Sequence, residues 1–245
     1  MMNYLMIFII FISFCFGETP TVEEILTKID NNLVFNKALT NSTMTIHSKS
    51  RSRTIKSRSW GKGSDLALVE YLYPPREKGK KMLKTKNKIW IYTPEPTDRI
   101  ITISGHMLRQ SVMGSDLSYE DITDNTSMLE NYTAKLLEDE KYLDRDCWVL
   151  ELAAKKKDIV YHSRKIWVDK ERFLPLKEER FAKSGRLLKT TKIPEVFFQD
   201  SRWLPKKMIF KDVLSKGKGT EYIINSIDFD VKMPEYYFTK AGLKR

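Results

Sequence analysis

The feature that most limits what this chain can fold into is a series of short alternating runs, which begins at residues 43–60. The even positions of this first run are mostly small or apolar, from Met44 to Trp60. Its odd positions include the basic residues Arg51 and Arg53. A period of two is that of a β-strand, whose successive side chains point to opposite faces. The run predicts one long strand with a basic face and a face of small side chains, behind which lies either a cavity or a closely packed helix.

Nine further runs are typical of strands, and many are separated by turn signals such as Pro74-Pro75 and Ser184-Gly185. They cover residues 66–72, 88–93, 99–103, 147–152, 159–168, 176–181, 187–193, 206–214 and 220–229. Many strands at hairpin spacing predict a large antiparallel sheet, curled into a barrel or half-barrel. Helical patterns occur at residues 22–33, 105–112 and 119–131.

The N-terminus is typical of an export signal. An apolar run over residues 4–16 precedes the first charged side chain, Glu18, and is shorter than the roughly 20 residues that a membrane-spanning helix needs. Cys15 and Gly17 fit the −3 and −1 positions of a cleavage site. The sequence therefore predicts a signal peptide at residues 1–17 and one exported domain at residues 18–245.

The two cysteines carry separate expectations. Cys15 allows a second interpretation of the N-terminus, in which this residue is acylated as in bacterial lipoproteins, although Phe14 stands where that route favours a small side chain. Without the signal, Cys147 is the only cysteine left, so no intramolecular disulfide can form. Its strand-like surroundings predict a small buried side chain.

The chain is basic, with 43 Lys and Arg against 32 Asp and Glu and a formal net charge of +11. Export argues against nucleic acid as the partner. Anionic lipid headgroups or an acidic protein face are the expected partners, and a solvated basic surface explains the charge equally well. The candidate contacts are Lys49, Arg51, Arg53 and Arg109.

Nothing in the sequence nominates an enzyme. The three histidines, His47, His106 and His162, have no metal-ligand spacing with one another, with Cys or with Asp. No nucleophile elbow, phosphate loop or dinucleotide glycine pattern occurs. The acidic residues around Asp116 and Asp121 are interpreted as a solvated turn. We expect no catalytic residue, no cofactor and no metal.

A surplus of large apolar side chains, either flexible or aromatic, is the feature of the sequence that points to lipid binding. Methionine suits an adaptable apolar surface, because its unbranched thioether refits to different shapes. The residues predicted to line a lipid-binding cavity or its lid are Trp90, Tyr92, Met107, Leu108, Val112, Met113, Trp167, Met208 and Phe210. Ordinary core packing is the alternative for each of them, whereas several of them together on a movable lid suit acyl chains.

Short motifs are spaced along the chain from residue 21 to its end. The most specific is GSDLSYED at residues 114–121. The others are WIYTP at 90–94, IWVD at 166–169, LPLK at 174–177, GRLLKT at 185–190, WLP at 203–205 and MP at 233–234. In their order and spacing these motifs resemble the LolA-like outer-membrane lipoprotein-sorting proteins.

The resemblance implies an α+β, β-dominated fold, in which a strongly curved antiparallel sheet forms an unclosed half-barrel and helices plug its concave face. It also implies a monomeric, non-enzymatic periplasmic carrier. Such a carrier binds the acyl chains of a lipid or lipoprotein in an apolar cavity and moves its cargo toward the outer membrane, after transient contact with a membrane. An inner-membrane transporter of the RND type is the expected partner. The rival interpretation is an accessory subunit that docks on such a transporter and holds no lipid.

Overall fold

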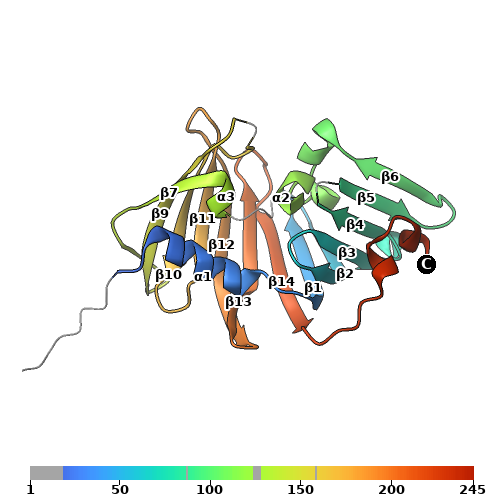
Figure 1. The fold of residues 1–245 in the computed structure, drawn as a ribbon. Coiled ribbons are helices and arrows are strands. Elements are labelled where there is room, and N and C mark those ends of the chain that lie inside the picture. The colour runs from blue at the N-terminus through green and yellow to red at the C-terminus, as the bar shows by residue number, and fades with distance from the viewer. Residues whose placement is uncertain (1–18, 87, 124–127, 158) are drawn as a thin grey trace, which may run out of the picture.

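Strands make up most of the computed structural model, which describes residues 19–86, 88–123, 128–157 and 159–245 (Figure 1). The strands are β1 Ala38–His47, β2 Ser52–Lys62, β3 Leu66–Tyr73, β4 Lys81–Thr85, β5 Lys88–Thr93, β6 Arg99–Ile103, β7 Tyr132–Leu136, β8 Glu140–Tyr142, β9 Arg145–Ala154, β10 Ser163–Asp169, β11 Pro175–Phe181, β12 Leu187–Gln199, β13 Arg202–Asp212 and β14 Gly219–Asp228. The helices are α1 Val22–Leu33, η1 Pro75–Glu77, η2 Gly105–Arg109, η3 Val112–Gly114, α2 Tyr119–Thr123, α3 Met128–Asn131, η4 Glu235–Phe238 and η5 Ala241–Lys244, where η marks a 3₁₀ turn.

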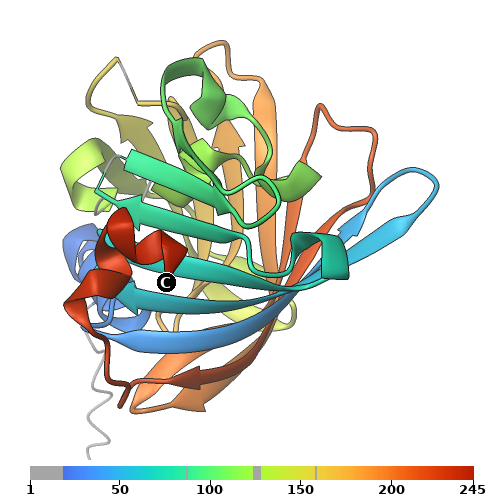
Figure 2. The same cartoon turned by 90° about the vertical axis from the view of Figure 1, so that its right-hand side faces the viewer.

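All the strands belong to one antiparallel sheet. Its order is β6-β5-β4-β3-β2-β1-β14-β13-β12-β11-β10-β9-β7, and β8 pairs with β9 off this path. The two end strands, β6 and β7, are not paired with each other, so the curved sheet stays open (Figures 1 and 2). The structure thus confirms the predicted β-dominated, unclosed half-barrel with helices.

The concave face of the sheet is the face covered by α1 and α2. Thr21 begins α1 with a capping box, in which its hydroxyl accepts from the Glu24 amide at 3.2 Å and its amide donates to the Glu24 carboxylate at 2.8 Å. The buried side chains of α1, which include Leu26, pack against Leu150 of β9 and Ile166 of β10. Fully burying one such side chain contributes roughly 1.5–3 kcal/mol, so this contact fixes α1 on the β7–β10 half of the sheet.

The convex face is covered over β2–β5 by the end of the chain, where η4 and η5 lie against the strands (Figure 2). Leu243 is fully buried there beside Leu68 and Leu83. A Cβ atom on Gly242 would lie 1.9 Å from the carbonyl oxygen of Tyr236, so only glycine fits at this position. On the other half of the sheet, Cys147 is buried on the convex face, as predicted for this residue.

The predicted long strand over residues 43–60 is wrong, because the chain turns back on itself in the middle of it. Strands β1 and β2 form a hairpin in which His47 pairs with Ser52. The amide and hydroxyl of Ser48 both donate to the carbonyl of Arg51, at 3.0 and 2.7 Å, and this closes the turn. Because the chain reverses at this turn, even positions of β1 pair with odd positions of β2. Ile46 and Arg53 therefore form a pair and lie on the same face.

Other predicted boundaries also shift. The helical pattern at residues 105–112 forms two 3₁₀ turns, and the strands β4, β7 and β8 were not predicted. The β10 strand begins at Ser163, after a loop that occupies the first part of the run predicted at residues 159–168. The signal peptide predicted at residues 1–17, with Cys15, lies outside the described residues.

Candidate functional site

A lid, defined as residues 104–123, lies on the concave face of the half of the sheet that runs from β1 to β6. It consists of η2, η3, α2 and the turns between them. Six of its side chains, Tyr119 and Ile122 of α2 and the four predicted apolar residues, belong to one cluster with residues of the strands beneath them. The four predicted residues are Met107, Leu108, Val112 and Met113, and the strand residues include Met44, Ile55, Tyr71, Met82, Ile89 and Ile103. The structure therefore brings together the four lid residues predicted from the sequence.

Met208 and Phe210 of β13 lie on the same concave face. Phe210 pairs with Thr220 and Met208 pairs with Tyr222, and Tyr222 packs against the cluster under the lid. Both predicted residues are half-buried, so apolar surface remains accessible beside the lid.

The three remaining predicted lipid contacts lie on the convex face. Trp90 and Tyr92 pack with the C-terminal segment around Leu243. Trp167 packs with Cys147, and its indole donates to the Glu140 carboxylate at 2.7 Å. The predicted set therefore falls on both sides of the sheet and cannot line a single cavity.

Asp116 joins the lid to strands β13 and β14. Its carboxylate accepts from the hydroxyl of the fully buried Thr220 at 2.7 Å and from the amide of Asp212 at 3.0 Å. The Asp116 amide in turn donates to the Thr220 hydroxyl at 3.0 Å. A buried carboxylate with this set of donors holds the lid in one position, because its removal would leave polar groups without partners.

Asp121 in α2 makes a second attachment. Its carboxylate accepts from Lys189 of β12 at 2.5 Å, from Arg180 of β11 at 3.1 Å and from the hydroxyl of Tyr161 at 2.5 Å. Burial raises the pKa of Asp121, but the charges of Lys189 and Arg180 outweigh it and lower the pKa to about 2. The carboxylate is thus ionised at any physiological pH, and the interpretation of Asp116 and Asp121 as a solvated turn is wrong.

The charged network continues below the lid along the concave face of β10 and β11. Glu178 accepts from Arg180 at 2.8 Å and from Arg164 at 3.2 Å, and Arg164 also donates to the hydroxyl of Tyr132 at 2.9 Å. Burial raises the pKa of Glu178, and the two arginines outweigh that effect and lower it. The Nε donor of Arg180 is buried without an acceptor among the described residues. Sequence reasoning missed these residues, although Arg164, Arg180 and Lys189 occupy paired positions on neighbouring strands.

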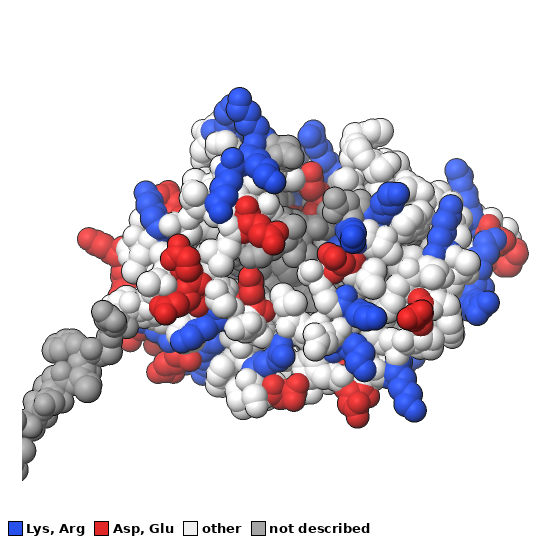
Figure 3. Space-filling model, in the orientation of Figure 1, with Lys and Arg blue, Asp and Glu red and all other residues white. Residues whose placement is uncertain are grey.

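The predicted basic contacts separate into two kinds. Arg53 is half-buried, and its guanidinium donates to the carbonyl of Met113 at the tip of the lid. Lys49, Arg51 and Arg109 are exposed. A small cavity of about 200 Å³ opens between the lid tip and the β1–β2 turn, and Arg51, Arg53 and Gly114 line it. Lys and Arg side chains also gather over the loops at the top of the face in Figure 3.

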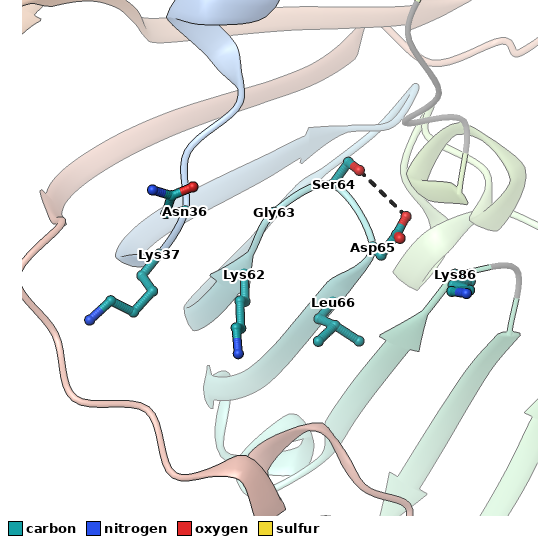
Figure 4. A pocket seen from close by; sticks show the side chains of 8 residues that line it. All are labelled: Asn36, Lys37, Lys62, Gly63, Ser64, Asp65, Leu66 and Lys86. Atoms are coloured by element: carbon teal, nitrogen blue, oxygen red, sulfur yellow. Dashed lines mark hydrogen bonds between the residues drawn. The ribbon is translucent and has the colours of Figure 1, made fainter. Parts of the chain in front are cut away.

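A larger surface pocket, of about 740 Å³, lies at the other end of β1 and β2. It is lined by Asn36, Lys37, Lys62, Gly63, Ser64, Asp65, Leu66 and Lys86. In Figure 4 Lys37 and Lys62 extend away from the β2–β3 turn, and the Ser64 hydroxyl donates to Asp65 at 3.4 Å. Lys37 also reaches the carbonyl of Val231 at 3.3 Å.

Within the part of the chain that the structure describes, no cluster of His, Cys, Asp and Glu has the makings of a metal site. None of the helices described has the length and apolar character that crossing a membrane requires.

Comparisons with known proteins agree with this architecture. A family model described as an uncharacterized protein matches residues 63–245. Among solved structures, a DUF1329 family protein from Desulfovibrio piger has a TM-score of 0.82 at 24% identity. The match covers 90% of this chain and 96% of that protein's chain. A domain assigned to an outer membrane lipoprotein-sorting protein from Vibrio parahaemolyticus has a TM-score of 0.78 at 26% identity, with 91% and 96% covered. A LolA superfamily protein from Nitrosomonas europaea has a TM-score of 0.74 at 24% identity, with 91% and 99% covered.

The chain belongs to the LolA-like fold family. The predicted family is thereby confirmed. Each of the three solved structures matches at least 90% of the chain of this LolA-like protein. A comparison with curated proteins finds no match.

Proposed function

We propose that this LolA-like protein is a non-enzymatic periplasmic carrier, which holds the acyl chains of a lipid or lipoprotein between its lid and the concave face of its sheet and moves them toward the outer membrane. The observation that carries the proposal is the lid itself. Four apolar side chains on one short segment, Met107, Leu108, Val112 and Met113, occupy the concave face where an acyl chain would lie. When the lid moves aside, an acyl chain replaces these side chains against the same apolar wall.

The energy of this exchange is sufficient for a reversible carrier. Each buried CH₂ group contributes about 0.8 kcal/mol, so even half of an acyl chain gains several kcal/mol. Lifting the lid exposes its own apolar side chains and breaks the bonds of Asp116 and Asp121, which offsets part of that gain. A carrier that must also release its cargo requires such a near balance.

The half-buried surface beside the lid supports the same proposal. Met208 and Phe210 extend the apolar wall beyond the lid onto β13. The unused Nε donor of Arg180 lies in the charged network that attaches the lid. This donor suits the polar end of an acyl-bearing cargo.

Location and partner rest on the relatives. Two of the similar structures are a domain of an outer membrane lipoprotein-sorting protein and a LolA superfamily protein. Sorting to the outer membrane takes place between two membranes. We propose the periplasm as the compartment, with an inner-membrane transporter of the RND type as partner and a monomer as the working form.

Native mass spectrometry with lipid extraction tests the proposal. The exported chain, purified without detergent, should carry a stoichiometric acyl species, and its mass identifies the cargo. A clean mass of the protein alone, together with failure to bind added fatty-acyl probes, would instead support the docking subunit without bound lipid.

A matched pair of variants locates the bound chain. Phe210→Ser alters the concave face, whereas Ile209→Ser alters the next residue of the same strand, which pairs with Lys192 and Glu221 on the convex face. We expect Phe210→Ser to weaken acyl-probe binding at least tenfold and Ile209→Ser to leave it close to wild type. Equal effects from both variants would contradict the proposed site.

A further inference from the structure

The loops at one end of the sheet form a basic rim, defined as residues 48–51, 155–157, 183–186 and 213–218. These segments contain nine Lys and Arg and no Asp or Glu. The basic residues are Lys49, Arg51, Lys155, Lys156, Lys157, Lys183, Arg186, Lys216 and Lys218, and all nine are exposed. None of the ion pairs between described residues involves any of them.

The sheet register places these four segments side by side. His47 pairs with both Ser52 and Gly219, so the β1–β2 and β13–β14 turns are neighbours, and the Lys218 amide donates to the His47 carbonyl at 2.7 Å. Phe181 pairs with both Leu187 and Ser163, so the β11–β12 turn lies next to the β9–β10 loop. Figure 2 shows all four loops along the same end of the curved sheet, and Figure 3 shows basic side chains over the part of this end that faces the viewer.

Exposed apolar side chains stand within this rim. Val213 and Leu214, at the β13–β14 turn, are 42% and 60% exposed. Their turn is nevertheless ordered by hydrogen bonds, because the Leu214 amide donates to the Asp212 carboxylate at 2.9 Å and Lys211 donates to the carbonyls of Ser215 and Gly217. Two apolar side chains held outward on a fixed turn, with lysines beside them, fit a surface that is negatively charged outside and apolar within.

We infer that the basic rim docks the protein on the surface of a membrane rich in anionic phospholipid, with Leu214 and Val213 entering the headgroup region. Unneutralised lysines near an anionic leaflet attract it electrostatically, and exposed apolar side chains add insertion. An acidic protein face would satisfy the lysines but offers no apolar interior to the valine and leucine, so the bilayer is the better match.

Docking by this end also faces the lid toward the membrane. The lid tip at Gly114 and the cavity beside it adjoin the β1–β2 turn of the rim, and Asp116 is bonded to Thr220 where β14 begins. An acyl chain that leaves the bilayer would meet the edge of the lid directly. The docking itself goes beyond the proposed carrier function and is measured without any transferred lipid.

Vesicle co-sedimentation tests the inference with the full chain. We expect binding to vesicles of phosphatidylcholine with phosphatidylglycerol, little binding to phosphatidylcholine alone, and weaker binding as salt is raised. Each lysine close to the surface contributes a factor of about five, so Lys155→Gln with Lys156→Gln and Lys157→Gln should weaken binding by roughly 100-fold. Val213→Ser with Leu214→Ser should weaken it severalfold and leave the salt dependence unchanged.

The control is a triple variant at the opposite end of the sheet, Lys62→Gln, Lys86→Gln and Lys88→Gln, which removes the same charge from exposed positions. Wild type and variants share one N-terminus, so differences between them come from the loops. Equal losses in the two triple variants, or full binding by the rim variant, overturn the inference. Absence of bound lipid in the purified protein would weaken the carrier proposal and leave this result intact.

Discussion

At the residue scale, the carboxylate of Asp121 links the lid to Lys189, Arg180 and Tyr161. The Asp121 side chain is 2% exposed, so Asp121→Asn leaves Lys189 without its counter-charge and Arg180 with Glu178 alone in a buried site. Breaking a buried pair by removing one partner costs about 3–5 kcal/mol. We expect a loss of unfolding free energy in that range, measured by urea denaturation.

Asp139→Asn is the matched control. It removes a carboxylate of the same kind that is 53% exposed and paired with Lys170. Exposed pairs contribute about 0–1 kcal/mol, so the midpoint of the urea transition should barely move. A similar loss in both variants would mean that the network around Asp121 is not specifically stabilising.

The pH dependence of stability follows from the same carboxylate. The pKa of Asp121 is lowered from 3.8 to about 2 in the folded protein, so its contribution is fully present above pH 3.8 and is lost as the pH falls toward 2. That difference corresponds to about 2 kcal/mol. The gap in unfolding free energy between wild type and Asp121→Asn should therefore be constant from neutral pH to about pH 5 and narrow only below about pH 4. A gap that closes near neutral pH would contradict the assignment.

Single residues also show which positions could not be predicted from the sequence. The alternation of strand-like runs, with the motif resemblance, predicted the open sheet and the apolar lid. It did not place Arg53, because the turn at Ser48 reverses the faces of the two strands. Trp90 was placed on the wrong face because β5 is apolar on both sides, with Ile89 under the lid and Trp90 under the C-terminal segment. Arg164 and Arg180 look like any solvated basic positions until the strand register pairs them.

At the scale of elements, the lid is attached to β14 through one hydroxyl. Thr220→Val keeps the side-chain shape and removes both hydrogen bonds to Asp116. A buried carboxylate that loses a donor costs about 1–3 kcal/mol, and the lid can avoid this cost by opening. Hydrogen exchange should therefore accelerate at residues 111–118 and stay slow in α1, and acyl probes should bind faster.

Thr43→Val tests whether the change is specific to the lid. The Thr43 hydroxyl accepts from Asn225 at 2.8 Å in an exposed part of β1, away from Asp116. Exchange of the lid amides should be unaffected in this variant. If both valine variants accelerate exchange in the lid equally, the Asp116 bonds are not what holds it.

The C-terminal segment is the second element with a sharp requirement. Gly242→Ala places a Cβ 1.9 Å from the Tyr236 carbonyl oxygen, so η4 and η5 must shift away from the convex face. Overpacking typically costs about 1–3 kcal/mol. Iodide should then quench tryptophan fluorescence more strongly, since Trp60 and Trp90 lie under this segment. In the control Gly61→Ala the nearest atom lies at 4.0 Å, and both stability and quenching should stay close to wild type.

At the scale of the whole molecule, the two halves of the sheet have different roles. The half from β7 to β10 carries the α1 core, in which apolar residues such as Ile29 and Leu152 are fully buried. The half from β1 to β6 is covered by a lid that is attached through polar groups at its edges. The lid can separate from the sheet without leaving buried charges unpaired, provided that the polar bonds at its edges are exchanged for others. We therefore expect the lid to move and α1 to stay in place.

This arrangement predicts how affinity depends on cargo length. If an acyl chain replaces the lid on the concave face, each added CH₂ should contribute about 0.8 kcal/mol, close to a fourfold gain in affinity, until the chain is as long as the wall that holds it. Saturation at a hundred times Kd should raise the unfolding free energy by about 2.7 kcal/mol. A series of saturated fatty acids, measured by calorimetry and thermal unfolding, should show this rise followed by a plateau. The plateau should come earlier in Phe210→Ser, because the wall is then shortened at β13. Affinity that does not depend on chain length, in wild type and variant alike, would show that acyl chains are not held along the sheet and would favour the docking subunit.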